Sequence, residues 1–159
     1  MFNLFGKKNK DLEIFSPGVG KLIDLKDVPD PVFAEKMMGD GFAFIPEEGV
    51  IKSPVEGVIS LMPDSRHAFG VTTAEGAEIL VHIGMDTVAL KGEGFETFKT
   101  MGDKVKVGEP IIEVNLTKVK DKVPSMATPI IITNMDEFEI KNINLNAKED
   151  EAVVEYVKK

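Results

Sequence analysis

The chain has two histidines among its 159 residues, and their surroundings differ. His82 lies in the apolar run 78–88, whereas His67 follows Ser65 in a more polar segment. A neutral imidazole is a competent nucleophile near neutral pH, and a phosphoryl group on its nitrogen is readily passed on. A second imidazole can donate an N–H to the phosphoryl oxygens, and a hydroxyl can fix that ring's tautomer. These residues therefore predict His82 as phosphoryl acceptor, His67 as the group that stabilises the phosphoryl group, and Ser65 as the residue that orients His67.

Two other uses of the imidazoles compete with this prediction. A histidine beside apolar residues is often a packed, hydrogen-bonded core side chain. Two histidines can also bind zinc, but these are 15 residues apart, and no cysteine is present to complete the ligands. Asp86, four residues after His82, would be the carboxylate that completes such a site. Because the histidine spacing does not match a zinc motif and cysteine is absent, we expect neither a metal nor a cofactor.

The elements that must position these residues have the pattern of β-strands. Fourteen glycines and nine prolines divide the chain into short β-branched runs, and long helical periodicity is absent. This pattern predicts an all-β fold, an antiparallel β-sandwich or barrel. The expected strands are 22–25, 42–46, 50–52, 57–62, 69–73, 78–83, 87–90, 95–100, 104–105, 110–115, 130–134, 140–144 and 152–158.

Alternation along the strand that carries His82 assigns its side chains to two faces. The odd-numbered residues from Ile79 to Met85 are expected to face the core. Leu80 shares the other face with His82, so the imidazole is expected in a shallow apolar depression that water can reach.

Short helical turns are expected at two places, 31–38 and 116–123. In the first, Phe33 and Met37 are four residues apart and share one face. Together with Met38 they form either core or a contact surface for several partners, because methionine adapts its shape readily. Their spacing favours the core.

Two weak repeats indicate an internal pseudo-repeat. Ser16-Pro17 recurs 37 residues later as Ser53-Pro54, in each case followed by a glycine and an apolar residue. The run that begins at Pro110 recurs 19 residues later at Pro129. Each unit has the pattern of a turn that leads into a buried strand, and stacked units of this kind remove exposed sheet edges.

The chain is acidic, with a formal net charge of -8 and a pI of about 4.8. Repulsion from the phosphate backbone argues against nucleic acid and favours basic partner surfaces. Asp30, Asp40 and Asp86 each flank an apolar segment and are candidates for an acidic fringe that attracts such a partner. Ordinary turn chemistry accounts equally for these aspartates, and best for Asp40, which lies between two glycines.

Composition indicates one soluble domain over 13–159, after a flexible tail over 1–12. Three apolar residues precede three lysines in that tail, which is either a frayed end or a peripheral membrane contact through residues 1–10. Without cysteine, disulfides and thiol catalysis are excluded. No signal peptide or transmembrane run is evident, so a cytoplasmic location is expected.

Five stretches of the chain resemble one known family, the glucose-type enzyme IIA component (EIIA) of the bacterial phosphoenolpyruvate-dependent sugar phosphotransferase system. They are 30–41, His67-Ala68-Phe69, 81–88, 90–95 and 105–108, and they occur in family order. The resemblance extends from about residue 14 to residue 159. It implies an antiparallel β-sandwich.

The resemblance also implies a function. Nε2 of His82 would accept a phosphoryl group from a histidine of the carrier protein HPr and pass it to a cysteine of an enzyme IIB domain attached to a sugar permease. His67 matches the second active-site histidine, and Ser65 stands where the family usually has threonine. Positions of the partner-binding face are matched by Asp30, Phe33, Met37, Met38, Asp86 and Val88. Leu80, on the same face, replaces a phenylalanine, which makes the rim less aromatic.

Two other functions remain open from the sequence. One is a zinc-dependent peptidase on a similar two-layer β scaffold, which would retain a tightly bound ion. The other is a regulatory module that binds transporters or kinases according to its phosphorylation state. The sugar is not identified, because EIIA domains of glucose, N-acetylglucosamine, sucrose and β-glucoside systems look alike.

Overall fold

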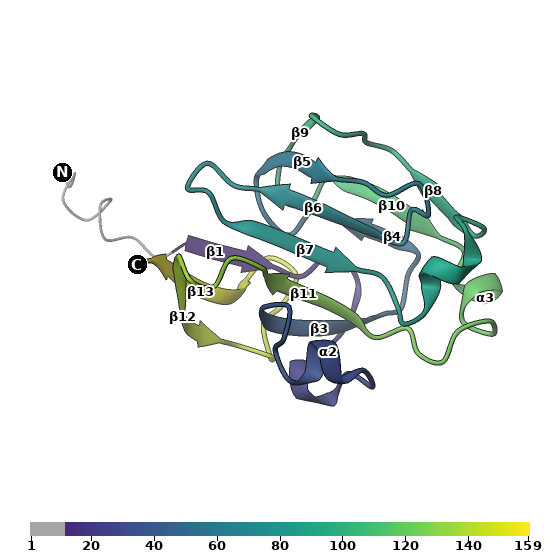
Figure 1. The fold of residues 1–159 in the computed structure, drawn as a ribbon, viewed down its shortest axis with the longest axis horizontal. Helices are drawn as coiled ribbons and strands as arrows, with labels where there is room; N and C mark the ends of the chain where they lie inside the picture. The colour runs from purple at the N-terminus through teal and green to yellow at the C-terminus, as the bar shows by residue number, and fades with distance from the viewer. Residues whose placement is uncertain (1–11) are drawn as a thin grey trace.

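The computed structural model describes residues 12–159, so the predicted membrane contact through residues 1–10 lies outside the described residues. Within them the all-β prediction is confirmed, because the strands pair into three antiparallel sheets (Figure 1). The largest sheet has the order β2 (Gly20–Asp24), β3 (Asp40–Pro46), β11 (Thr128–Ile132), β7 (Glu78–His82), β6 (Ala68–Thr72), β5 (Gly57–Leu61) and β9 (Lys104–Val105).

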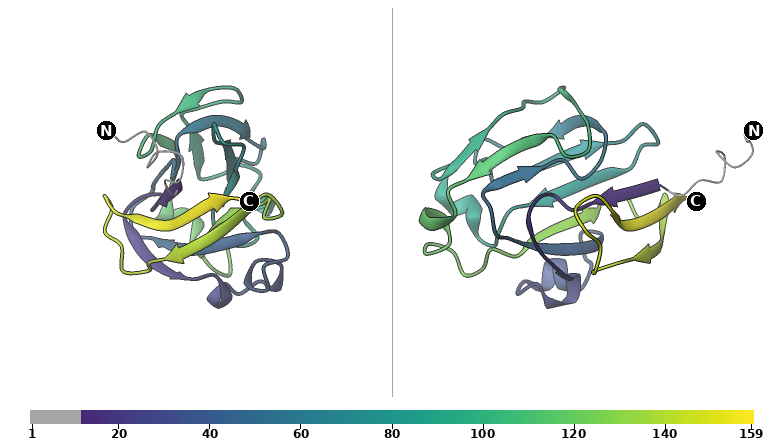
Figure 2. Two further views of the ribbon diagram at one scale, coloured as in Figure 1. Left: turned by 90° about the vertical axis from the view of Figure 1, so that its left-hand side faces the viewer. Right: turned by 180° about the vertical axis from the view of Figure 1, so that it is seen from behind.

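Two three-stranded sheets complete the fold. Their orders are β4 (Val50–Lys52), β10 (Pro110–Val114) and β8 (Phe95–Thr97), and β1 (Leu12–Phe15), β13 (Ala152–Lys158) and β12 (Phe138–Ile143). The sheet that contains β10 lies behind the large sheet in Figure 1 and in front of it in the reverse view (Figure 2, right). The sheet that contains β13 lies at the end of the molecule where the chain terminates.

The main hydrophobic core lies between the large sheet and the two small sheets. Fully buried side chains reach it from all three, including Phe42 of β3, Ile112 of β10 and Tyr156 of β13. A second, smaller core lies on the outer face of the large sheet. There Leu25 and Phe33 cover Ala43, Ala68, Leu80 and Ile131. His82 packs against Phe33 on this face, and both histidines are half-buried.

Short helices cover the outer face. They are the 3-10 helix η1 (Leu25–Asp27) and the α-helix α2 (Pro31–Ala34), which lies below β3 in Figure 1. Asp30 caps α2, because its side chain accepts a hydrogen bond from the backbone N–H of Val32 at 2.9 Å. The second predicted turn is α3 (Leu116–Val119), which Asn115 caps in the same way. Both helices are shorter than the patterns predicted.

One expected strand is wrong. Residues 87–90 form the 3-10 helix η2 (Thr87–Leu90) instead of a strand. The residues at its two ends, Asp86 and Lys91, have left-handed φ angles of 59° and 54°, which turn the chain out of the extended conformation. In addition, β1 was not expected; it begins at Leu12 and pairs with β13.

The predicted pseudo-repeat corresponds to equivalent structure. The two Ser-Pro turns join β1 to β2 and β4 to β5, and they are hydrogen-bonded to each other reciprocally. Phe15 N–H donates to the carbonyl of Pro54 at 2.9 Å, and Lys52 N–H donates to that of Pro17 at 2.6 Å. The second repeat corresponds to strands β10 and β11.

Candidate active site

Strand pairing explains why the two imidazoles meet. In the antiparallel register of β6 and β7, Ala68 lies opposite His82, which places the preceding residue, His67, beside the end of β7. Ile83 N–H donates to the carbonyl of His67 at 2.7 Å and extends the pairing by one step. As a result the two ring centroids are 5.0 Å apart with planes inclined by 81°. The structure thus brings together histidines that are 15 residues apart in the sequence.

Each ring is held through its Nδ1 atom. His82 Nδ1 lies 2.9 Å from the carbonyl oxygen of Gly84. A carbonyl only accepts, so Nδ1 must carry the proton, and Nε2 of the neutral ring keeps its lone pair. His67 Nδ1 lies 2.5 Å from Ser65 Oγ. A left-handed residue, Arg66 at φ 58°, turns the chain so that Ser65 reaches the ring.

Burial lowers the pKa of both histidines. For His82 the loss of solvent is the main cause, and the Gly84 carbonyl and the charge of Asp30 oppose it in part. For His67 burial is again the main cause, and repulsion from His82 adds to it. Both pKa values lie below the ordinary 6.5, so both rings are neutral at pH 7. A neutral ring is the form in which an imidazole acts as a nucleophile.

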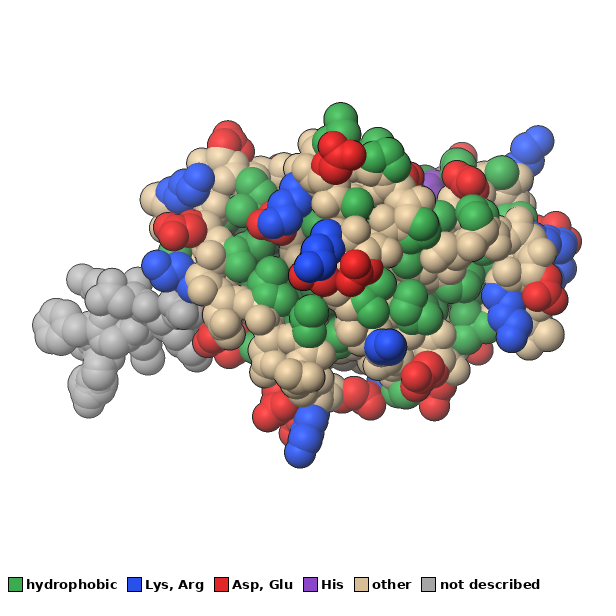
Figure 3. Space-filling model, turned by 90° about the horizontal axis from the view of Figure 1, so that it is seen from below, with side chains coloured by type: hydrophobic (Ala, Val, Ile, Leu, Met, Phe, Trp, Pro, Cys, Tyr) green, Lys and Arg blue, Asp and Glu red, His purple; other side chains and the backbone are tan. Residues whose placement is uncertain are grey.

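Of the apolar residues expected around the histidines, some are buried and some are exposed. The Phe33 ring packs against His82 with centroids 5.1 Å apart, and Phe33 itself is buried. Leu80 is 8% exposed, whereas Met38 is 43%, Val88 56% and Met37 70% exposed. Hydrophobic side chains gather on this side of the molecule with acidic ones among them, and a histidine is visible near them (Figure 3).

The preference for a core position is correct for Phe33 and wrong for the two methionines that follow. Helix α2 ends at Ala34, and Lys36 takes a left-handed φ of 62°. The helical spacing of four residues therefore does not continue to Met37, which points into solvent. Phe33 supports the ring of His82 while Met37 and Met38 remain exposed.

The aspartates differ in their surroundings. Asp30 caps α2 and its charge acts on His82. Asp86 precedes η2, and its side chain makes no capping hydrogen bond. Asp40 begins β3, and its carboxylate lies 3.6 Å from Lys36 Nζ and accepts from the N–H of Gly41.

Met85 is not on the face that the sequence pattern predicted. It packs in the second core with Leu80, whereas Ile79, Val81 and Ile83 reach the main core as expected. The strand ends at His82, and Gly84 takes a φ of 70°, so alternation stops before Met85.

Sequence reasoning missed two threonines behind His82. Thr87 and Thr128 are fully buried; Thr87 donates to the carbonyl of Ile83, and Thr128 accepts from the N–H of Gly84. Thr128 is 44 residues from Gly84 in the chain, so no local pattern indicates the contact. Gly84 permits this close packing, because a Cβ there would lie 3.3 Å from the carbonyl oxygen of Ser125.

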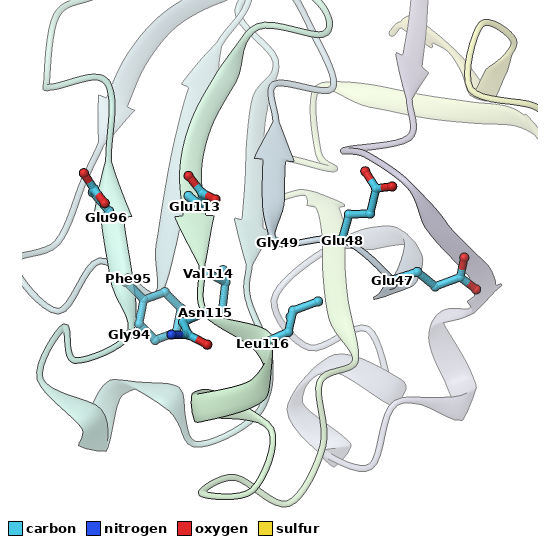
Figure 4. Close-up of a pocket in the computed structure, with 10 residues that line it drawn as sticks. All are labelled: Glu47, Glu48, Gly49, Gly94, Phe95, Glu96, Glu113, Val114, Asn115 and Leu116. Carbon is cyan, nitrogen blue, oxygen red and sulfur yellow. The ribbon is translucent and has the colours of Figure 1, made fainter.

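The hollow shown in Figure 4 is lined by neither histidine and does not provide a competing site. It measures about 630 Å³ and is bordered by four exposed glutamates. Their carboxylates spread apart and do not converge (Figure 4). Across residues 12–159, no group of three or more His, Cys, Asp or Glu side chains is placed to hold a metal ion. The ligand set of a zinc peptidase is therefore not assembled in the described part of the chain. No helix in that part is long and apolar enough to span a membrane.

Comparison with known proteins gives the class of this one. Residues 12–138 match the family model described as phosphoenolpyruvate-dependent sugar phosphotransferase system, EIIA 1, whose members are transferase components of sugar transport. A solved structure, glucose permease IIA from Mycoplasma capricolum, has the same fold, with a TM-score of 0.88 and 39% identity over 97% of this chain and 98% of the other. The chain belongs to the EIIA 1 family, as the sequence resemblance indicated.

Curated relatives agree with this assignment. The chain is 46% identical over 143 residues to the PTS system glucose-specific EIIA component of Staphylococcus aureus strain COL. The aligned region covers 88% of this chain and 86% of that protein. The protein of the same name from strain MSSA476 matches with the same values.

Proposed function

We propose that this chain is a phosphocarrier that takes a phosphoryl group from phospho-HPr on Nε2 of His82 and delivers it to a cysteine of an enzyme IIB domain. In the first step the lone pair of Nε2 attacks phosphorus, a new N–P bond forms, and the N–P bond to the donor histidine breaks. In the second step the cysteine thiolate attacks phosphorus, and the imidazole of His82 leaves with its lone pair. One observation carries the proposal: two imidazoles meet on an exposed apolar face, with Nδ1 of His82 already hydrogen-bonded.

The assignment of the acceptor atom follows from the tautomer. Nδ1 of His82 is occupied by its hydrogen bond to Gly84, so only Nε2 has a lone pair available. The lowered pKa keeps that lone pair free of a proton at pH 7. His82 is thus prepared for attack before a donor arrives, which reduces the reorganisation needed in the transition state.

His67 is the candidate electrophilic partner. If the Ser65 hydroxyl donates to its Nδ1, the proton of the neutral ring sits on Nε2 and can be donated to an equatorial phosphoryl oxygen. Phosphoryl transfer depends mainly on positioning and on stabilisation of charge on those oxygens. The low-dielectric surroundings, including Phe33, strengthen that hydrogen bond.

The exposed apolar rim is the candidate docking face for both partners. HPr and the IIB domain must each reach His82, so they use the same face in turn. Met37, Met38 and Val88 offer adaptable contacts, and Leu80 contributes its exposed edge. Asp30 and Asp86 add negative charge for a basic partner surface.

The test is phosphopeptide mapping after incubation with phosphoenolpyruvate, enzyme I and HPr. We expect one labelled peptide, which contains His82. A label elsewhere, or no label with active HPr, contradicts the proposal. Glucose is the first sugar to test, because the Staphylococcus relatives are named glucose-specific components. A carrier supplied by HPr works in the cytoplasm, which is the location we propose.

A regulatory use of the same face is the second candidate. The exposed side chains of Met37 and Val88 can contact a transporter or kinase as well as a transfer partner. A phosphoryl group on His82 adds up to about two negative charges in the middle of that contact. Partners of this kind would bind only the unphosphorylated form, and a pull-down with both forms tests this.

A further inference from the structure

We propose that Thr128 and Thr87 are positioning residues for phosphoryl acceptance. Together they hold the peptide groups around Gly84, whose carbonyl keeps the proton of His82 on Nδ1. Neither threonine hydroxyl contacts the reacting ring; each acts through the backbone. The inference rests on the proposed function and extends it to residues behind the site.

Burial of the two hydroxyls is the first observation. Four polar side chains are buried among residues 12–159, namely Ser53, Thr73, Thr87 and Thr128. A hydroxyl in an apolar interior is unfavourable unless it is hydrogen-bonded, so its partners indicate its purpose. Two of the four bind the backbone of Ile83 and Gly84, the two residues that follow His82 in the sequence.

Both polar groups of the peptide between Ile83 and Gly84 are bound by these threonines. Thr87 Oγ1 donates to the carbonyl of Ile83 at 2.6 Å. Gly84 N–H donates to Thr128 Oγ1 at 3.3 Å, and that hydroxyl donates in turn to the carbonyl of Met126 at 2.9 Å. Both the N–H and the carbonyl of this peptide group are thus hydrogen-bonded, which fixes the orientation of the peptide plane.

The next peptide, between Gly84 and Met85, is fixed in a similar way. Met85 N–H donates to the carbonyl of Ser125 at 2.9 Å. The other end of this peptide is the Gly84 carbonyl, which accepts from His82 Nδ1 at 2.9 Å. Since an N–H that donates polarises its amide, the bond to Ser125 also makes the Gly84 carbonyl a better acceptor.

Close packing prevents the turn from rotating. Gly84 has a φ of 70°, and a Cβ at this residue would lie 2.8 Å from Cγ2 of Thr87. The Thr87 methyl therefore occupies the space beside the glycine while its hydroxyl holds Ile83. If the turn relaxed, the Gly84 carbonyl would move away from Nδ1, and the proton would be free to sit on Nε2. A ring with its proton on Nε2 has no lone pair at the proposed acceptor atom.

The experiment compares Thr128→Val and Thr128→Ser with the matched control Thr73→Val. Thr73 is also a buried threonine whose hydroxyl binds a backbone N–H, that of Ala77, and it lies outside the site. The tautomer of His82 is measured by ¹⁵N NMR of the free, unphosphorylated protein. The rate of phosphoryl acceptance from phospho-HPr is measured on the same samples.

For Thr128→Val we expect a mixture of His82 tautomers and acceptance slower by roughly tenfold, which corresponds to about 1.4 kcal/mol. Thr128→Ser should restore the single tautomer and the rate, and Thr73→Val should change neither. A Thr128→Val protein that keeps the single Nδ1-protonated tautomer overturns the inference, whether or not its rate falls. If Thr128→Val does not fold, Thr87→Val with Thr87→Ser gives the same comparison.

Failure of this inference is distinguishable from failure of the proposed function. The NMR measurement needs no phosphoryl donor, so the role of Thr128 is tested even in a protein that accepts no phosphate. Conversely, a wild-type protein that shows the single tautomer but is not labelled by phospho-HPr contradicts the proposed function alone.

Discussion

The imidazole of His67 meets that of His82 edge to face, with ring centroids 5.0 Å apart and planes inclined by 81°. In the proposed mechanism this arrangement places the N–H donor ring beside the nucleophilic ring. It also arises directly from strand pairing, since Ala68 lies opposite His82 in the sheet. Under the proposed function, the different partners of their Nδ1 atoms give these two rings different tasks.

The first prediction concerns the proposed acceptor. His82→Ala should abolish phosphoryl acceptance, because no other lone pair occupies this position. The measurement is incorporation of label from phosphoenolpyruvate through enzyme I and HPr. Circular dichroism of the variant provides the control for folding. Substantial label on His82→Ala would show that the acceptor lies elsewhere.

Replacing the stabilising histidine separates the two transfers. His67→Ala should still accept phosphate but hand it on to the IIB domain more slowly, by roughly 10²- to 10³-fold. The reason is that the charge on the equatorial oxygens loses its N–H donor. Rapid-quench measurement of both half-reactions checks this. A His67→Ala protein that cannot accept phosphate, or that delivers it at the wild-type rate, would contradict the stabilising role proposed for His67.

Removing the hydroxyl beside His67 should have a smaller effect. Ser65→Ala leaves the ring in place but releases its tautomer, and we expect delivery to slow by roughly tenfold. Ser65→Thr retains the hydroxyl and provides the matched control, with near wild-type rates. Equal rates for the alanine and threonine variants would mean that the 2.5 Å contact to His67 has no part in transfer.

The lowered pKa values of the histidines make folding stability depend on pH. A histidine whose pKa is lowered in the native state binds its proton more readily when unfolded, so stability falls as pH decreases through about 6.5. The His67→Gln, His82→Gln double variant should lose less stability between about pH 7.5 and about pH 5.5 than the wild type. Urea unfolding at each pH gives the free energies. A wild type with the flatter profile would contradict the lowered pKa values.

The docking face is tested by adding charge at its exposed rim. Val88→Asp should weaken HPr binding by roughly tenfold or more, because a charge replaces an apolar contact that is buried in the complex. Ile143→Asp is the matched control, since Ile143 is also an exposed aliphatic residue but lies on β12. Isothermal titration with HPr gives the affinities. Similar losses in both variants would mean that Val88 is not part of the interface.

The sequence predicted most of the strands because their alternation and their glycine and proline boundaries are local. Two of its failures lie where the backbone takes left-handed turns at residues other than glycine. Asp86 and Lys91 convert an apparent strand into η2, and Lys36 turns Met37 out of the core. No composition signal marks such residues, since the surrounding tertiary structure holds them in place.

The sequence indicated the residue types of the candidate site but not the contacts that hold them. Two histidines with different surroundings, and a serine two residues before His67, were enough to indicate phosphoryl transfer. The hydrogen bonds that hold the backbone after His82 could not be predicted, because Thr128 is 44 residues from Gly84 in the chain. Such contacts follow from the order of strands in the sheet, in which β11 pairs with β7, and not from local sequence.

The most direct test of the central claim is the position of the phosphoryl group on the phosphorylated protein, determined by ³¹P and ¹⁵N NMR. Coupling of phosphorus to Nε2 of His82, with Nδ1 still protonated, is the result expected from the hydrogen bond to Gly84. Phosphorus bound to Nδ1 of His82, or to His67, would contradict it.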